Sequence, residues 1–291
     1  MNLSIQDHSR NSVAHDNTVK KGRLLAVDTS TAAMSVALLE GEQLVRESLY
    51  HAERNHSIFL LPMIHALLLQ QEQELANLQA VAVGIGPGSY TGIRIGVTTM
   101  KTIAWSCKLP IVGVSSLEAM ALGGWETDGY SVVNSDVRKV NSVTPNKVEW
   151  IVPLMDARRK QVYTGMYVAA VGNVSQISEK YNWHGIRPDA IRLLAPWLQE
   201  LLLHARSLNS DEAPLRISFV GEVEAIYADL QEFAEEWQGE TSIRKHDIRA
   251  YYVGKLAVQR YADNDIDDVH NLVPNYTQLA EAEAVLLAKS K

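Results

Sequence analysis

Two short segments of the sequence carry the residue types from which a phosphate or metal site could be built. The first is Asp28-Thr29-Ser30, where a carboxylate and two hydroxyls follow the apolar run Leu24–Val27. An aspartate in that position could hold a metal-bound phosphate. It could equally cap the turn through side-chain hydrogen bonds to the backbone, as Asp, Ser and Thr commonly do. The residue types alone leave both roles open.

The second segment runs from Val81 to Cys107 and joins a buried strand, a glycine-rich turn and a helix. Val81–Ile85 is apolar and β-branched, Gly86-Pro87-Gly88-Ser89 breaks the strand, and a helix is expected from about Thr91. A helix N-terminus behind such a turn offers unpaired N–H groups to an anion, but a tight strand-to-helix turn uses the same residues. The candidate nucleotide- or anion-binding residues are Asp28, Thr29, Ser30, Gly86, Gly88, Ser89, Thr91 and Gly92.

The best-known nucleotide and nucleophile motifs are absent from this glycine segment. Gly84–Ser89 lacks the last glycine of G-x-G-x-x-G, and no Gly-Lys-Ser/Thr follows. In Gly88–Gly92 the serine directly follows the first glycine, which differs from the G-x-S-x-G turn of hydrolases. A dinucleotide-binding, P-loop or hydrolase assignment is therefore disfavoured.

Composition sets further bounds on function. With 291 residues, 46% apolar and 21% charged, the chain is long enough for two lobes with hydrophobic cores. The net charge of -7 disfavours a broad surface for phosphates, so tight nucleic-acid binding by the chain alone is not expected. The single cysteine, Cys107, excludes an intramolecular disulfide and a cysteine-based zinc cluster. No signal peptide or membrane-spanning run is evident, so we expect a cytoplasmic protein without membrane contact.

The order of apolar runs predicts a mixed α/β protein. Three strands in meander are followed by a helix, a strand, a helix and a strand. Residues 1–22 are polar and aperiodic and are expected to form a disordered leader, and 126–147 a polar insertion. We expect an N-terminal lobe over 23–125, completed by a C-terminal helix within 270–291, and a second lobe over 148–269.

The two helices expected near 58–73 and 91–107 carry apolar residues around most of their circumference. Such helices are either enclosed within their own domain or offer a second face to another chain, and two in succession favour a helical subunit interface. A charged residue at Ile93 or Ile95 is expected to abolish association and leave the monomer folded. The predicted interface residues are Ile58, Leu61, Ile64, Leu68, Tyr90, Ile93, Arg94, Val97, Met100 and Trp105.

A hairpin is expected from Glu149 to Ala169, with charged residues at its tip. Arg158 and Arg159 at that tip could contact an anion or a partner, or they could be solvated turn charges. The pattern alone does not separate these roles.

Several of these motifs together resemble the TsaB (YeaZ) family, the bacterial accessory subunits for making threonylcarbamoyladenosine beside the tRNA anticodon. The likeness runs from Leu24 to about Glu283 and departs from the family pattern at Thr277-Gln278. It rests on the segments Leu25–Thr31, Gly86–Gly96, Val114–Ala119, Asp156-Ala157-Arg158 and Pro274-Asn275-Tyr276. The resemblance implies an α/β, two-lobed actin-like or sugar-kinase-like (ASKHA, ribonuclease H-like) fold.

The resemblance also implies a non-catalytic subunit that binds and activates a TsaD-like enzyme. Relative to the metal-binding His-x-x-x-His motif of that enzyme, this chain has Ser116 and Met120, which are poor ligands for a hard metal. His56 and His65 are nine residues apart and do not form a metal pair on one helical face. No catalytic residue and no metal site are therefore expected.

The implied partners are a TsaD-like subunit joined through a helical bundle, a TsaE-like ATPase in a larger complex, and tRNA through the complex only. We expect a homodimer when the chain is alone, no cofactor bound by the chain itself, and ATP or ADP at or near the partner interface. The alternative is an enzyme of the same fold: an ATP-dependent small-molecule kinase or a glycoprotease-type metallopeptidase. The first lacks a second phosphate loop in the C-terminal half, and the second lacks metal ligands.

Overall fold

The computed structural model describes residues 22–51, 55–127, 147–171, 183–209, 212–237 and 239–277. Residues 1–21 of the predicted leader, most of the predicted insertion and residues 278–291 of the range given to the C-terminal helix therefore lie outside the described residues.

The first sheet has the strand order β3-β2-β1-β4-β5. Its first three strands form an antiparallel meander, and β4 and β5 run parallel to β1. All five occur where the sequence analysis predicted strands. The bounds are β1 Arg23–Asp28, β2 Ala33–Glu40, β3 Gln43–His51, β4 Ala80–Gly84 and β5 Ile111–Val114.

Both faces of this sheet are covered, which explains why β1 is apolar at every position from Leu24 to Val27. Alternate residues point to opposite faces: Leu25 and Val27 pack under α1 (His56–Gln70) and α2 (Tyr90–Cys107), whereas Leu24 and Ala26 face α6 (Ala250–Ala262). A short 3₁₀ helix, η1 (Leu75–Asn77), precedes β4.

The position of α6 differs from the expected division of the chain. The range 148–269 was assigned to the second lobe, but α6 packs on the first sheet, along β1 and β2. Gly254 allows this close approach, because a Cβ there would lie 2.4 Å from the Leu39 side chain. The following tail stays on the same lobe, where Asp267 bridges to Ile111 of β5.

The second sheet has the strand order β10-β9-β6-β7-β8. Read from the opposite edge, the order is β8-β7-β6-β9-β10. Each sheet thus begins at one edge with its third strand in sequence, followed by its second, first, fourth and fifth, so the two sheets have the same topology. The bounds are β6 Lys147–Asp156, β7 Gln161–Val171, β8 His184–Leu193, β9 Arg216–Gly221 and β10 Glu240–Lys245. The hairpin predicted with a charged tip is thus β6–β7.

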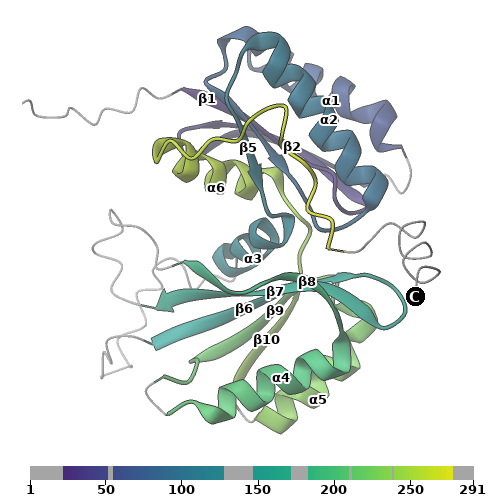
Figure 1. Ribbon diagram of the computed structural model, residues 1–291, viewed down its shortest axis with the longest axis vertical. Coiled ribbons are helices and arrows are strands. Elements are labelled where there is room, and N and C mark those ends of the chain that lie inside the picture. The colour runs from purple at the N-terminus through teal and green to yellow at the C-terminus, as the bar shows by residue number, and fades with distance from the viewer. Residues whose placement is uncertain are drawn as a thin grey trace, which may run out of the picture.

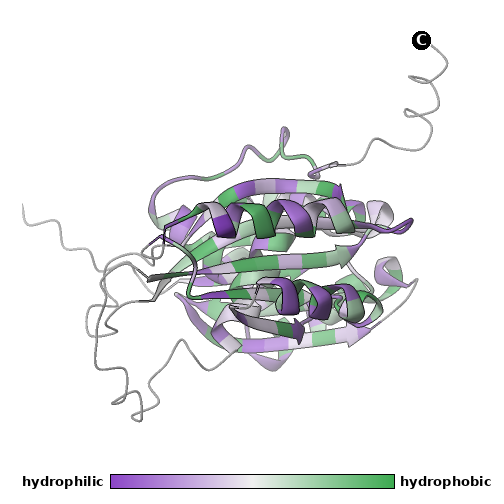
Figure 2. Ribbon diagram, turned by 90° about the horizontal axis from the view of Figure 1, so that it is seen from below, coloured by the Kyte–Doolittle hydropathy of each residue, from purple (hydrophilic) through white to green (hydrophobic). Residues whose placement is uncertain are grey.

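The outer face of the second sheet is covered by α4 (Leu194–Ser207) and α5 (Tyr227–Trp237), and the short η4 (Glu224–Ile226) precedes α5. Figure 2 shows hydrophilic and hydrophobic residues alternating along the helices on this side. That pattern is expected of helices with one face on a sheet and one in solvent.

Five layers result, visible from top to bottom in Figure 1: α1 with α2, the first sheet, α6 with α3 (Ser116–Thr127), the second sheet, and α4 with α5. One hydrophobic cluster extends through the middle layer and includes Ala26 of the first sheet and Ile151 and Tyr167 of the second. The two lobes therefore share a core, with α3 on the second sheet and α6 on the first.

Candidate functional site

The carboxylate of Asp28, at the carboxyl end of β1, is fully buried and hydrogen-bonded within the chain. Its Oδ1 accepts from the backbone N of Ser30 at 2.8 Å and from the Ser30 Oγ at 2.6 Å, and its Oδ2 accepts from the Ser116 Oγ at 2.6 Å. Burial raises the pKa of Asp28, and the hydrogen bonds from Ser116 and Ser30 act in the opposite direction.

Ser116 connects this carboxylate to the glycine turn. Its Oγ accepts from the backbone N of Gly86 at 3.1 Å, and its own backbone N donates to the Gly86 carbonyl at 2.9 Å. Asp28, Ser116 and Gly86 therefore join the end of β1, the start of α3 and the turn after β4.

The glycines of the second segment allow the start of α2 to lie directly on the Thr29-Ser30 turn. A Cβ at Gly88 would lie 2.3 Å from the Ser30 carbonyl oxygen, and one at Gly92 would lie 2.2 Å from that of Thr29. A Cβ at Gly96 would lie 2.4 Å from the Thr29 Oγ1, which itself donates to the Gly92 carbonyl at 2.7 Å. Close backbone packing thus accounts for these glycines without a bound anion.

Ser89 begins α2 as its N-cap. Its Oγ accepts from the backbone N of Gly92 at 3.2 Å, and its backbone N donates to the Ser30 carbonyl at 2.7 Å. His56, at the start of α1, places Nε2 2.9 Å from the Thr31 carbonyl oxygen. Both contacts hold the turn after β1 in place.

A cleft of about 1320 Å³ separates this region from the second lobe. Asp28, Thr29 and Gly86 lie behind the cleft surface, where their polar groups meet other parts of the chain. The predicted residues that line the cleft are Ser30, Gly88, Ser89, Thr91 and Gly92.

The opposite wall is the β6–β7 hairpin, which brings Arg158 and Arg159 to the cleft. Arg158, Arg159 and Lys160 have φ values of 63°, 53° and 61°, so three consecutive non-glycine residues adopt the left-handed conformation. Asp156 stabilises this turn because its Oδ1 accepts from the backbone N of Arg158 at 2.8 Å. Glu222, whose pKa is raised by burial, accepts from the backbone N of Asp156 on the same wall.

The structure divides the predicted interface residues into two groups. Ile58, Leu61 and Trp105 expose 63%, 56% and 65% of their surface, and Tyr90 and Arg94 are also exposed. The other five are buried beneath α1 and α2, so for them the prediction of an exposed surface is wrong: Ile64, Leu68, Ile93, Val97 and Met100.

The helical period explains this correction. Ile93, Val97, Met100 and Ala104 follow one another at three- and four-residue spacing and form the inner stripe of α2. The outer face carries Thr98, Thr102 and Ser106 instead of apolar residues, with Trp105 at the end. For α2 the expectation of apolar residues around most of the circumference is therefore wrong. Because Ile93 is buried, a charge at this position is now expected to destabilise the monomer itself.

An aromatic and cationic cluster at the start of α2 was not predicted. The rings of Tyr90 and Tyr276 lie 5.3 Å apart, the Arg94 guanidinium lies 4.4 Å from the Tyr90 ring, and Arg94 Nε donates to the Tyr276 hydroxyl at 2.9 Å. The sequence offered no signal for this contact, because 182 residues separate Arg94 from Tyr276.

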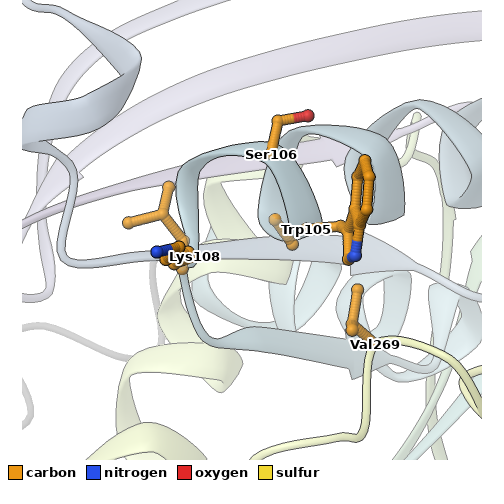
Figure 3. A pocket seen from close by; sticks show the side chains of 6 residues that line it. Trp105, Ser106, Lys108 and Val269 are labelled. Atoms are coloured by element: carbon orange, nitrogen blue, oxygen red, sulfur yellow. The ribbon is translucent and has the colours of Figure 1, made fainter.

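A second hollow, of about 490 Å³, lies at the other end of α2 (Figure 3). The exposed Trp105 stands beside Val269 of the C-terminal tail, and Leu109 and Lys108 complete the rim. It is largely apolar and lies on the same helix as the predicted interface.

Ser116 and Met120, which stand at the positions compared with a His-x-x-x-His motif in the sequence analysis, both make contacts inside the protein. Ser116 binds Asp28, and the Met120 sulfur packs so closely on Gly221 that a Cβ there would lie 2.5 Å away. Within the described residues no group of three or more His, Cys, Asp or Glu side chains is placed to hold a metal ion. Over the same residues, no helix has the length and apolar character needed to cross a membrane.

Two α/β lobes of equal strand order around a shared core, with a cleft between them, define an ASKHA-type fold. Comparison with known proteins agrees: YeaZ from Pseudomonas aeruginosa superposes with a TM-score of 0.61 at 23% identity, covering 88% of this chain and 99% of that structure.

The sequence comparisons assign the family. The family model for TsaD, tRNA N6-adenosine threonylcarbamoyltransferase, matches residues 50–284. The chain is 34% identical to the tRNA threonylcarbamoyladenosine biosynthesis protein TsaB of Bacillus subtilis, over 92% of this chain and 99% of that protein. It is 33% identical to TsaB of Escherichia coli over 58% of this chain and 62% of that protein. The chain belongs to the TsaB (YeaZ) family.

Proposed function

We propose that this chain acts in tRNA threonylcarbamoyladenosine biosynthesis as a non-catalytic subunit that binds and activates a TsaD-like partner. The observation that carries the proposal is an exposed apolar stripe on α1. The stripe consists of Ile58, Leu61, Pro62 and Leu69, with His65 at its centre. These positions share one helical face, on the side away from the first sheet.

Such a stripe is costly to leave in water. Burial of one large aliphatic side chain contributes about 1.5–3 kcal/mol, and Ile58, Leu61 and Leu69 are all more than half exposed. Their spacing fits a second helix lying along α1, the arrangement by which amphipathic helices recognise one another.

The neighbouring α2 adds features of a helical interface. Arg94 near its start and Trp105 near its end are residue types that often dominate binding energy. Thr98 and Thr102 between them are small enough to let another helix approach closely. A pair of partner helices packed on α1 and α2 would complete a helical bundle, and a second copy of this chain could occupy the same surface when the partner is absent.

The surroundings of Asp28 support a non-catalytic role. Its carboxylate oxygens accept hydrogen bonds from Ser30 and Ser116, and it is buried behind the cleft. The alternative, a kinase or glycoprotease-type metallopeptidase, would require this carboxylate to be released before it could reach a substrate or metal. We further propose that any ATP or ADP binds at or near the partner interface, within a complex that includes a TsaE-like ATPase.

Co-purification tests the interface. The chain is co-expressed with the TsaD-like protein from the same source, and Ile58→Asp and Leu61→Asp are each expected to lower co-purification at least ten-fold. Leu203→Asp is the matched control, because Leu203 is 66% exposed on α4, on the far side of the molecule. Survival of the complex in both α1 variants, or equal loss in the control, would contradict the proposed surface.

Activation is tested with the purified assembly. Threonylcarbamoylation of tRNA is measured with the partner alone, with the unchanged chain added, and with Leu61→Asp added. The unchanged chain is expected to raise the rate and the variant to restore little of it. Equal rates with and without the chain would refute an activating role.

A further inference from the structure

We infer that the mouth of the interlobe cleft binds a single-stranded RNA segment directly, through a basic tip on one wall and two tyrosine rings on the other. The basic tip is Arg158-Arg159-Lys160, of which Arg158 and Arg159 line the cleft, and the rings are those of Tyr90 and Tyr276. The net charge of -7 disfavours tight nucleic-acid binding by the chain alone, and the family resemblance implies contact with tRNA only through a complex. The inference deepens the proposed function but does not depend on the partner.

The basic tip presents three exposed cations. In the part of the chain that the structure describes, none of the three forms an ion pair with a carboxylate. The backbone of the tip is held by hydrogen bonds from Gln161 N to the Arg158 carbonyl and from Leu194 N to the Lys160 carbonyl, at 2.9 Å and 3.1 Å. Exposed cations at a cleft attract phosphates.

The two carboxylates on the same wall are directed at backbone groups. Asp156 Oδ1 accepts from the backbone N of Arg158, and Glu222 Oε2 accepts from the backbone N of Asp156, both at 2.8 Å. These hydrogen bonds of Asp156 and Glu222 stabilise the backbone conformation of the basic tip. The side chains of Arg158 and Arg159 remain available to a ligand.

The opposite wall provides aromatic surface. Tyr90 and Tyr276 are each 44% exposed, and both rings line the cleft. Arg94 keeps the pair together by lying over Tyr90 and donating to the Tyr276 hydroxyl. Exposed tyrosine rings and guanidinium planes are the surfaces on which unpaired RNA bases stack.

The combination favours single-stranded RNA over other ligands. A duplex hides its base faces from the tyrosines, and an acidic protein segment would use the cations but not the rings. A segment of unpaired nucleotides carries both bases and phosphates, and the cleft of about 1320 Å³ is large enough for more than one of them.

The test uses the full chain alone with a fluorescent anticodon stem-loop RNA, and measures affinity by anisotropy over a series of KCl concentrations. Arg158→Gln combined with Arg159→Gln is expected to weaken binding. It should also reduce the slope of log K against log salt by about 1.4, since each phosphate contact on a single strand contributes about 0.7. Arg206→Gln with Lys245→Gln is the matched control, because both residues are exposed cations on the α4 and β10 side of the second lobe, and the net charge changes equally.

Stacking is tested separately with Tyr276→Leu, which is expected to weaken RNA binding about ten-fold without changing the salt slope. Tyr227→Leu is its control, because Tyr227 has a similar exposure of 46% at the start of α5. Absence of RNA binding, equal effects in the controls, or equal affinity for a fully paired RNA or for ATP would each overturn the inference. The proposed partner interface is tested by co-purification, so failure of one does not imply failure of the other.

Discussion

At the residue scale, Asp28 is a buried carboxylate whose oxygens are hydrogen-bonded within the chain. A carboxylate after the first strand could serve a phosphate or a turn. In the structure its oxygens accept hydrogen bonds from Ser30 and Ser116, and Ser116 also accepts from Gly86. Ser116, at the start of α3, makes this contact with a carboxylate 88 positions earlier in the chain.

Removal of the Ser116 hydroxyl should therefore destabilise the fold. Ser116→Ala leaves Asp28 Oδ2 and the Gly86 N–H without this partner in a buried place, and such unsatisfied groups cost about 1–3 kcal/mol each. Urea unfolding should show a lower free energy of unfolding. Ser106→Ala is the control, because the Ser106 hydroxyl is exposed and donates only to the Thr102 carbonyl of its own helix, so a change below about 0.5 kcal/mol is expected.

A buried histidine predicts a pH dependence of stability. Burial lowers the pKa of His246 from 6.5 to about 4, and its Nε2 is among the buried atoms without a hydrogen-bond partner in the described residues. The unfolded chain takes up a proton near pH 6.5, whereas the folded chain does so only near pH 4. Acidification through this window thus favours unfolding.

His246→Gln removes this effect. The free energy of unfolding of the unchanged chain should fall relative to that of the variant as the pH is lowered from 7 to 4. Buried carboxyl groups with raised pKa values, such as Asp28 and Glu118, act in the opposite direction, but they are common to both proteins and cancel in the difference. A difference independent of pH would contradict the assignment, and His65→Gln on the exposed face of α1 controls for the loss of a histidine.

At the element scale, α1 and α2 each have an inner face that packs on the first sheet and an outer face that is exposed. The inner faces complete the core over the first sheet, whereas the outer face of α1 remains apolar and that of α2 is rich in threonine. Apolar composition identifies both helices as unusual, but only their packing shows which residues are free for a partner.

Substitution of one isoleucine on each face, Ile93 on the inner face of α2 and Ile58 on the outer face of α1, tests this difference in burial. Ile93→Ala should lower the free energy of unfolding by about 2–5 kcal/mol, because Ile93 is 1% exposed and its removal leaves a cavity. Ile58→Ala should change it by less than about 0.5 kcal/mol, because Ile58 stands in solvent. Thermal and urea denaturation of the isolated chain measure both, and equal losses would show that the outer face is covered in solution.

At the scale of the whole molecule, the two lobes are joined by a common hydrophobic cluster around α3 and α6. A chain built this way should unfold as one unit, since exposure of one sheet also uncovers the other. Leu25→Ala removes a side chain from the cluster under α1 and α2. It should lower the midpoint of urea unfolding equally by circular dichroism and by tryptophan fluorescence, to which Trp150 and Trp197 of the second-lobe core contribute. Two separate transitions would show that the lobes are independent.

Local patterns in the sequence were sufficient for much of the fold. The apolar run Leu24–Val27 predicted β1, the breaks at Gly86–Ser89 predicted the turn before α2, and the charges at Arg158 and Arg159 marked the tip of a hairpin. These features depend on the conformational preferences and burial of neighbouring residues, which are written into a short stretch of chain.

Only the tertiary structure decided which side chains are exposed to a ligand or partner. In the structure Asp28 and Ile93 are buried, and Tyr276 accepts a hydrogen bond from Arg94. Helix α6, expected in the second lobe, packs on the first sheet. Each of these outcomes depends on contacts between segments far apart in the chain, so periodicity and residue type along one segment could not reveal them. The family was therefore evident from the sequence, whereas the surfaces on which the proposed function depends are defined by folding.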